Sequence, residues 1–116
     1  MKAAEAWCSV EFTIGIIGGK WKPRILLQLR DGPKRFNALQ RALPEITHRV
    51  LTLQLRALET DGIIERKDYG ENPPRVEYSF TKEGKTLGPA LDAMEKWGEE
   101  RRPTAAGGQS TAEKLP

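Results

Sequence analysis

The chain has 116 residues, a length that suits one domain with a single hydrophobic core and short appendages. Its net charge is only +3, no apolar run approaches membrane-spanning length, and the first residues lack a secretory signal pattern. We therefore expect a cytoplasmic protein without a membrane segment, and the single cysteine, Cys8, excludes an internal disulfide.

The first element that the sequence predicts is a helix over residues 8–18. Val10, Ile14 and Ile17 fall on one side of it, so we expect this helix to be largely buried. The pair Gly18-Gly19 lacks the spacing of a phosphate-binding loop and is interpreted as a helix stop.

Three further helices are expected before the hydrophobic pattern changes to that of strands. Pro23 suits the first turn of one, which is followed by the apolar positions 25, 26 and 29. A second helix covers residues 36–43 and stops at Pro44. Thr47 is the predicted N-cap of a third helix, whose apolar stripe consists of Leu51, Leu55 and Leu58.

After this third helix the hydrophobic period changes from helical to alternating. Val76, Tyr78 and Phe80 alternate with polar residues, which predicts a half-buried strand. Residues 63–69 are its expected hairpin partner, and residues 70–74 form the loop, where proline removes no ladder hydrogen bond.

The C-terminal part is predicted to hold one long helix and a tail. Thr81 caps the expected helix, and residues 103–116 show no periodicity, so we expect a disordered tail after a domain that spans residues 1–102. The apolar stripe of the final helix consists of Leu87, Leu91, Met94 and Trp97.

The order helix, turn, helix, β-hairpin predicts an α+β, mostly helical fold, a winged helix-turn-helix with a two-stranded β-hairpin wing. Basic residues gather on its reading part: between Lys20 and Thr60 nine Lys or Arg stand against three Asp or Glu. This segment therefore carries +6 and the rest of the chain −3. Such a concentration suits a DNA backbone, because neutralised phosphates release counterions, although many basic faces are merely solvated.

The helix after Thr47 is the candidate reading element, because a helix in the major groove reads bases mainly with its N-terminal residues. Arg49 suits guanine O6 and N7, Thr52 or Leu53 suits a thymine methyl, and Arg56 suits a phosphate. The alternative is an ordinary solvated helix face. The candidate base-reading residues are Thr47, His48, Arg49, Thr52 and Leu53.

Two further groups are candidate DNA contacts. Lys34, Arg35 and Asn37 stand at the start of the preceding helix, where free N–H groups favour a phosphate. Arg75, at the wing, suits the minor groove, or it pairs at the surface with an acidic neighbour, either Glu71 or Glu77.

The sequence gives little support for metal binding or catalysis. His48 is the single histidine and belongs to no cluster at metal-ligand spacing, so we expect no metal site. No nucleophile, base and supporting group form a recognisable set. We therefore expect no cofactor and no enzymatic activity.

The chain resembles the HxlR-type winged-helix transcriptional regulators of bacteria and archaea over about residues 8–98. The departures are Ser9, where the family usually has proline, and Leu53, where many relatives have a polar residue, so base preference is not carried over. The matching stretches are Cys8, IGGKW at 17–21, ILLQL at 25–29, RFNALQRALPEIT at 35–47, LRALETDGIIER at 55–66 and PPRVEYSFTKEGKTL at 73–87.

The resemblance implies a small homodimer that binds inverted repeats in double-stranded promoter DNA and acts as a repressor or an activator. It also implies dimerisation through the N- and C-terminal helices, here about residues 8–18 and 82–99. No small-molecule effector is identified. The residues we assign to the dimer interface are Val10, Ile14, Leu87, Leu91, Met94 and Trp97.

Cys8 has two interpretations. A lone cysteine beside a hydrophobic helix is often a small packing residue. At a helix N-terminus, however, the dipole favours the thiolate and its reaction with oxidants and electrophiles. Some members of the family sense quinones, aldehydes or disulfide stress through the equivalent cysteine, and both interpretations stay open.

The sequence thus predicts first a dimeric, sequence-specific DNA-binding transcriptional regulator, a repressor that Cys8 makes responsive to oxidants or electrophiles. The alternative is a winged-helix module for protein contacts without specific DNA binding, which predicts weak, salt-insensitive behaviour toward DNA.

Overall fold

The structure, a computed structural model, describes residues 8–103. The chain is divided into two compact units, and the boundary lies between Lys85 and Thr86. In the described part no helix is long and apolar enough to cross a membrane. The elements of the first unit are α2 (Ser9–Ile17), α3 (Lys22–Leu29), β1 (Lys34–Arg35), α4 (Phe36–Ala42), α5 (His48–Thr60), β2 (Ile64–Asp68), β3 (Val76–Phe80) and α6 (Lys82–Lys85), and the second unit contains α7 (Gly88–Arg101).

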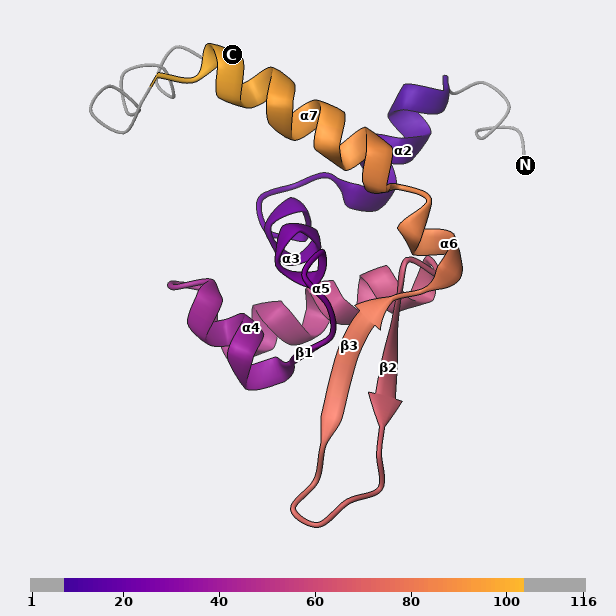
Figure 1. The fold of residues 1–116 in the computed structure, drawn as a ribbon, viewed down its shortest axis with the longest axis vertical. Coiled ribbons are helices and arrows are strands. Elements are labelled where there is room, and N and C mark those ends of the chain that lie inside the picture. The colour runs from indigo at the N-terminus through magenta and orange to yellow at the C-terminus, as the bar shows by residue number, and fades with distance from the viewer. Residues whose placement is uncertain (1–7, 104–116) are drawn as a thin grey trace. The chain divides into compact units, whose positions relative to one another are not determined.

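The core of the first unit lies among α3, α4, α5 and the base of the sheet. Figure 1 shows the three helices grouped together and the hairpin of β2 and β3 extending away from them. The predicted apolar stripes of α3 and α5 face this core, which confirms the helical periods on which they rest. The most deeply buried side chains are Ile25, Leu26, Leu39, Leu51, Leu55, Leu58 and Ile64.

The predicted hairpin is present, but its sheet has a third strand. The described strands form an antiparallel sheet in the order β1-β3-β2. Its register pairs Ile64 with Phe80 on one side of β3 and Lys34 with Tyr78 on the other. A strand of two residues has no alternation to detect, which is why the sequence pattern predicts only a two-stranded wing.

The prediction that the first helix is largely buried is wrong for the single chain. In α2 only Ile17, in the last turn, is buried, whereas Val10, Phe12 and Ile14 are exposed. Apolar residues stand on opposite sides of this helix, so no single core can cover them all. The predicted stop is confirmed, with Gly18 as the C-cap.

The long final helix is also corrected, because it is divided into α6 and α7. Thr81 caps the first piece as predicted, since its Oγ1 accepts from the backbone N–H of Gly84 at 2.8 Å. Pro89 stands in the first turn of α7, where it lacks the N–H that a continuous helix would need. Of the tail that we expect to be disordered, residues 104–116 lie outside the described residues.

A tight joint connects the wing to the end of α5. Thr81 donates its hydroxyl to the carbonyl of Gly62 at 2.6 Å, and its backbone N–H donates to the carbonyl of Ile63 at 3.0 Å. Gly84 packs so closely that an added Cβ would collide with the Ile63 carbonyl oxygen. The return strand is therefore fastened to the helix that carries the candidate reading residues.

Candidate nucleic-acid interface

The outward face of α5 presents two arginines and a leucine. Its inward stripe is almost completely buried, which forces the opposite face toward solvent. Arg49, Leu53 and Arg56 are exposed there, at spacings of four and three residues, so they form one row along the helix. Leu53 keeps 50% of its surface exposed, which leaves an apolar group between the two arginines for a contact outside the chain.

The N-terminal end of α5 is fixed by the turn before it. Thr47 is the N-cap, as predicted, and its Oγ1 accepts from the N–H of Val50 at 3.1 Å. Gln40 of α4 donates its side-chain amide to the carbonyl of Ile46 at 3.3 Å. Glu45 turns the chain with a positive φ of 82°. These contacts set the angle at which α5 leaves α4.

Besides the N-cap Thr47, two of the predicted base-reading residues have partners within the protein. The His48 ring lies 4.6 Å, centroid to centroid, from the ring of Phe36, tilted by 46°. The hydroxyl of Thr52 donates to the carbonyl of His48 at 2.9 Å, and Thr52 is half-buried. Arg49 and Leu53 are thus the more available side chains of the first turns.

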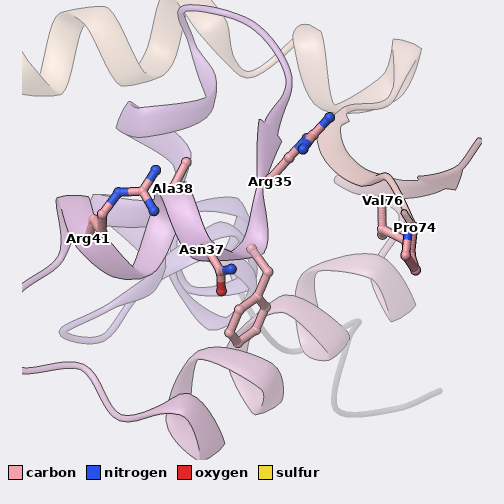
Figure 2. Close-up of a pocket in the computed structure, with 7 residues that line it drawn as sticks. Arg35, Asn37, Ala38, Arg41, Pro74 and Val76 are labelled. Carbon is pink, nitrogen blue, oxygen red and sulfur yellow. The ribbon is translucent and has the colours of Figure 1, made fainter. Parts of the chain in front are cut away.

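An open hollow of about 410 Å³ brings the start of α4 together with the wing. Figure 2 shows Arg35, Asn37 and Arg41 on one side of it and Pro74 and Val76 on the other. The structure therefore unites two groups that the sequence analysis treats separately. The lining residues are Arg35, Phe36, Asn37, Ala38, Arg41, Pro74 and Val76.

Arg41 is a site residue that the sequence analysis does not single out. It follows Asn37 by four residues, so both fall on the same side of α4, and this spacing was the available signal. Lys34, which the sequence analysis does name, is half-buried, and its backbone pairs with Tyr78 in the sheet.

In the described chain Arg75 pairs with both of its acidic neighbours. Its Nε donates to Glu77 Oε2 at 3.3 Å, and its Nη1 donates to Glu71 Oε2 at 3.4 Å. Partial burial lowers the pKa of Arg75, whereas the hydrogen bond and charge attraction to Glu77, with the charge of Glu71, raise it by more. Arg75 therefore keeps its positive charge at neutral pH.

Cys8 occupies the N-cap of α2, as one of its two interpretations requires. It is a free, exposed thiol whose Sγ accepts from the N–H of Glu11 at 3.4 Å. The Glu11 carboxylate in turn accepts from the Cys8 N–H at 3.4 Å, which completes a capping box. The thiol is thus accessible to small reagents.

The residues assigned to a dimer interface differ in exposure. On α2, Val10 and Ile14 are exposed. On α7, Met94 and Trp97 are exposed and Leu91 is buried, and in the preceding segment Leu87 is half-buried. Each helix therefore presents large apolar side chains to solvent in the single chain.

A helix pair joined by a fixed turn, an exposed row of arginine and leucine, and a hydrogen-bonded wing define a winged helix-turn-helix regulator. The model of the HxlR-like helix-turn-helix family matches residues 16–105, and the chain belongs to that family. It is 54% identical over 95 residues to YybR, an HTH-type transcriptional regulator of Bacillus subtilis strain 168, covering 82% of this chain and 76% of YybR.

Solved structures agree with this assignment. The redox regulator HypR in its oxidized form is 52% identical, with a TM-score of 0.78, and the match covers 84% of this chain and 100% of HypR. The reduced form of the transcriptional regulator YodB from B. subtilis is 31% identical, with a TM-score of 0.73, and covers 82% of this chain and 94% of YodB. The predicted family and fold class are confirmed.

Proposed function

We propose that this protein is a homodimeric transcriptional repressor that binds an inverted repeat in double-stranded DNA. The observation that carries the proposal is the outward row of Arg49, Leu53 and Arg56 on a helix whose opposite face is fully buried. Membership of a family of HTH-type regulators supports the same assignment. In this proposal α5 enters the major groove.

Each residue of the row has a distinct role. Arg49, near the N-terminus of α5, donates to guanine O6 and N7, and Leu53 packs against a thymine methyl. Arg56 lies farther along and contacts a phosphate. His48, Thr47 and the half-buried Thr52 complete the first turns, where bonds within the protein restrict what they offer a base.

The hollow beside the wing, together with Lys34 just before it, supplies the anchoring contacts. Lys34, Arg35 and Asn37 bind the phosphate backbone next to the base-reading helix, and Arg75 of the wing approaches the adjacent minor groove. Because phosphate contacts carry no sequence information, these residues set affinity and register while α5 sets preference.

Dimerisation uses the exposed apolar side chains of α2 and α7. Scattered apolar side chains are normal on a surface, but here five large ones stand on two helices, and four of them are assigned to the interface: Val10, Ile14, Met94 and Trp97. The proposal also includes Leu87 and Leu91 in the interface. A two-fold dimer places two base-reading helices about one DNA turn, or a multiple of it, apart.

Cys8 gives the repressor a response to oxidants or electrophiles. Its exposure and its place at the start of α2 support this, as does the similarity to a protein described as a redox regulator. Two Cys8 thiols from two subunits can give up two electrons and two protons to diamide, which becomes the hydrazine, and form one disulfide. An electrophile instead alkylates the thiol.

Selection of genomic fragments followed by salt-titrated binding tests the proposal. We expect enrichment of an inverted repeat, affinity that falls steeply with salt, and lower transcription from a template that carries the repeat. Weak binding that ignores sequence and salt would instead favour the winged-helix module for protein contacts. Light scattering tests the dimer, and a monomer mass with and without the repeat would contradict it.

The test for Cys8 compares wild type with Cys8→Ser, each with and without diamide or a quinone. We expect reagent to weaken the DNA affinity of wild type only. Equal loss in both proteins, or loss in neither, would show that Cys8 is a packing residue.

A further inference from the structure

Below the tip of the wing, three side chains close a triangle of contacts. The guanidinium carbon of Arg75 lies 3.9 Å from the centroid of the Tyr69 ring. Its Nε donates to one oxygen of Glu77 at 3.3 Å, and the hydroxyl of Tyr69 donates to the other at 3.1 Å. We name Tyr69, Arg75 and Glu77 the wing triangle. Its backbone is fixed too, because the Tyr69 N–H donates to the Arg75 carbonyl at 2.9 Å.

The two carboxylates that contact Arg75 differ in their surroundings. Glu77 keeps only 18% of its side chain exposed, and the sheet register places it between Arg35 and Lys67. Glu71 lies at the exposed tip, with 52% of its side chain exposed and a single contact of 3.4 Å to Arg75. An exposed pair of this kind contributes little and is readily replaced by a phosphate, whereas Glu77 is held on both oxygens.

We propose that Glu77 is a positioning residue, which together with Tyr69 holds the wing arginine ready for DNA, and that Glu71 is only a competitor that DNA displaces. The inference rests on the proposed function. Arg75 has five N–H donors; Glu77 takes the one on Nε and Glu71 one on Nη1, so the terminal edge of the guanidinium remains for a phosphate at the rim of the adjacent minor groove. Because the side chain is already ordered, less conformational entropy is lost when DNA binds.

Simple charge counting makes a different prediction. Glu71 and Glu77 each place one negative charge on the same wing, so removal of either would strengthen DNA binding by a similar factor. If Glu77 positions Arg75, the two substitutions have opposite effects. Glu71→Gln and Glu77→Gln are matched, because each removes one charge and keeps the side-chain length.

The experiment measures binding of the full chain to a fluorescein-labelled mixed-sequence duplex across a salt titration. We expect Glu71→Gln to bind about twofold more tightly and Glu77→Gln about three- to fivefold more weakly than wild type. Arg75→Ala should weaken binding and reduce the salt slope by about one. In the Arg75→Ala background, Glu77→Gln should no longer weaken binding.

A second variant and a direct signal separate positioning from loss of structure. Tyr69→Phe keeps the ring beneath Arg75 but removes the hydroxyl that braces Glu77, and we expect weaker binding without a change in thermal unfolding. In NMR spectra the Nε–H of Arg75 should be protected from exchange in wild type and less protected in Glu77→Gln, whose side chain keeps one acceptor oxygen but no charge.

Each contrary result has a separate meaning. Equal tightening by both glutamine variants, an unchanged affinity in Arg75→Ala, or an unchanged Arg75 signal in Glu77→Gln would overturn the inference and leave the proposed DNA-binding function standing. If wild type bound neither this duplex nor any selected fragment, the proposed function would fail and the inference with it.

Discussion

Replacement of Leu53 by alanine probes the apolar side chain of the outward row. Complete burial of a leucine side chain contributes about 1.5–3 kcal/mol. Leu53 is 50% exposed in the free protein, so contact with a thymine methyl can bury at most this exposed half of the side chain. The DNA contact is therefore worth at most about 0.8–1.5 kcal/mol, and we expect Leu53→Ala to bind its site more weakly by at most about four- to twelvefold.

The assay deletes both members of the proposed contact, the Leu53 side chain and the thymine methyl. Duplexes in which deoxyuridine replaces thymidine lack the C5 methyl, so they delete the group that Leu53 is proposed to contact. Wild type should lose affinity on the methyl-free duplex by the same factor as Leu53→Ala loses on the normal one. The variant should show no further loss, which is the coupling expected in a double-mutant cycle.

Stability provides the matched control for this prediction. Leu51, two residues earlier, is completely buried, and Leu51→Ala should lower the free energy of unfolding by about 2–5 kcal/mol. Leu53→Ala should cost less, at most about 0.8–1.5 kcal/mol, because only half of the side chain is buried and alanine is at least as good a helix former as leucine. Two results would refute the reasoning. One is that Leu53→Ala loses the same affinity, relative to wild type, on the normal and on the methyl-free duplex. The other is that Leu53→Ala unfolds as early as Leu51→Ala.

Two further pairs of substitutions follow from the structure. Arg49→Ala should relax base preference at a cost of about 1–3 kcal/mol on the specific site, whereas Arg35→Ala should weaken binding to every sequence and flatten the salt dependence; the opposite pattern in competition assays would exchange their roles. Thermal unfolding should separate two glycine substitutions. Gly84→Ala should destabilise the fold by about 3 kcal/mol or more, because the added Cβ would collide with the Ile63 carbonyl. Gly98→Ala should stabilise α7 by up to about 1 kcal/mol, because nothing described lies within 4 Å of the added Cβ.

Much of the fold follows from local patterns that any reader of the sequence can see. The stripe of α5 repeats with the helical period, and its residues are buried as that period requires. Thr47 and Thr81 cap the helices they precede because a hydroxyl there satisfies a free N–H in any context. Cys8 likewise stands at a helix start, as its position before the first apolar period indicates.

Structural features that depend on residues far apart in the chain could not be predicted from local sequence patterns. The pairing of β1 with β3 joins residues more than forty positions apart, and two residues carry no strand signal. The contact of Phe36 with His48 depends on the angle between α4 and α5. The exposure of Val10 and Ile14 depends on whether another surface covers them, which periodicity in one chain does not report.

These distant contacts also bear on how affinity and base preference are coupled in the proposed function. The register places Arg35 beside Glu77 of the wing, while the next residue, Phe36, contacts His48 at the start of α5. The anchoring residues, the wing triangle and the base-reading helix thus share neighbouring backbone. A backbone shift at the start of α4 would move a phosphate contact and the entry angle of α5 together. Substitutions that reshape this junction should therefore change affinity and base preference in step, whereas those confined to the outward row should separate them.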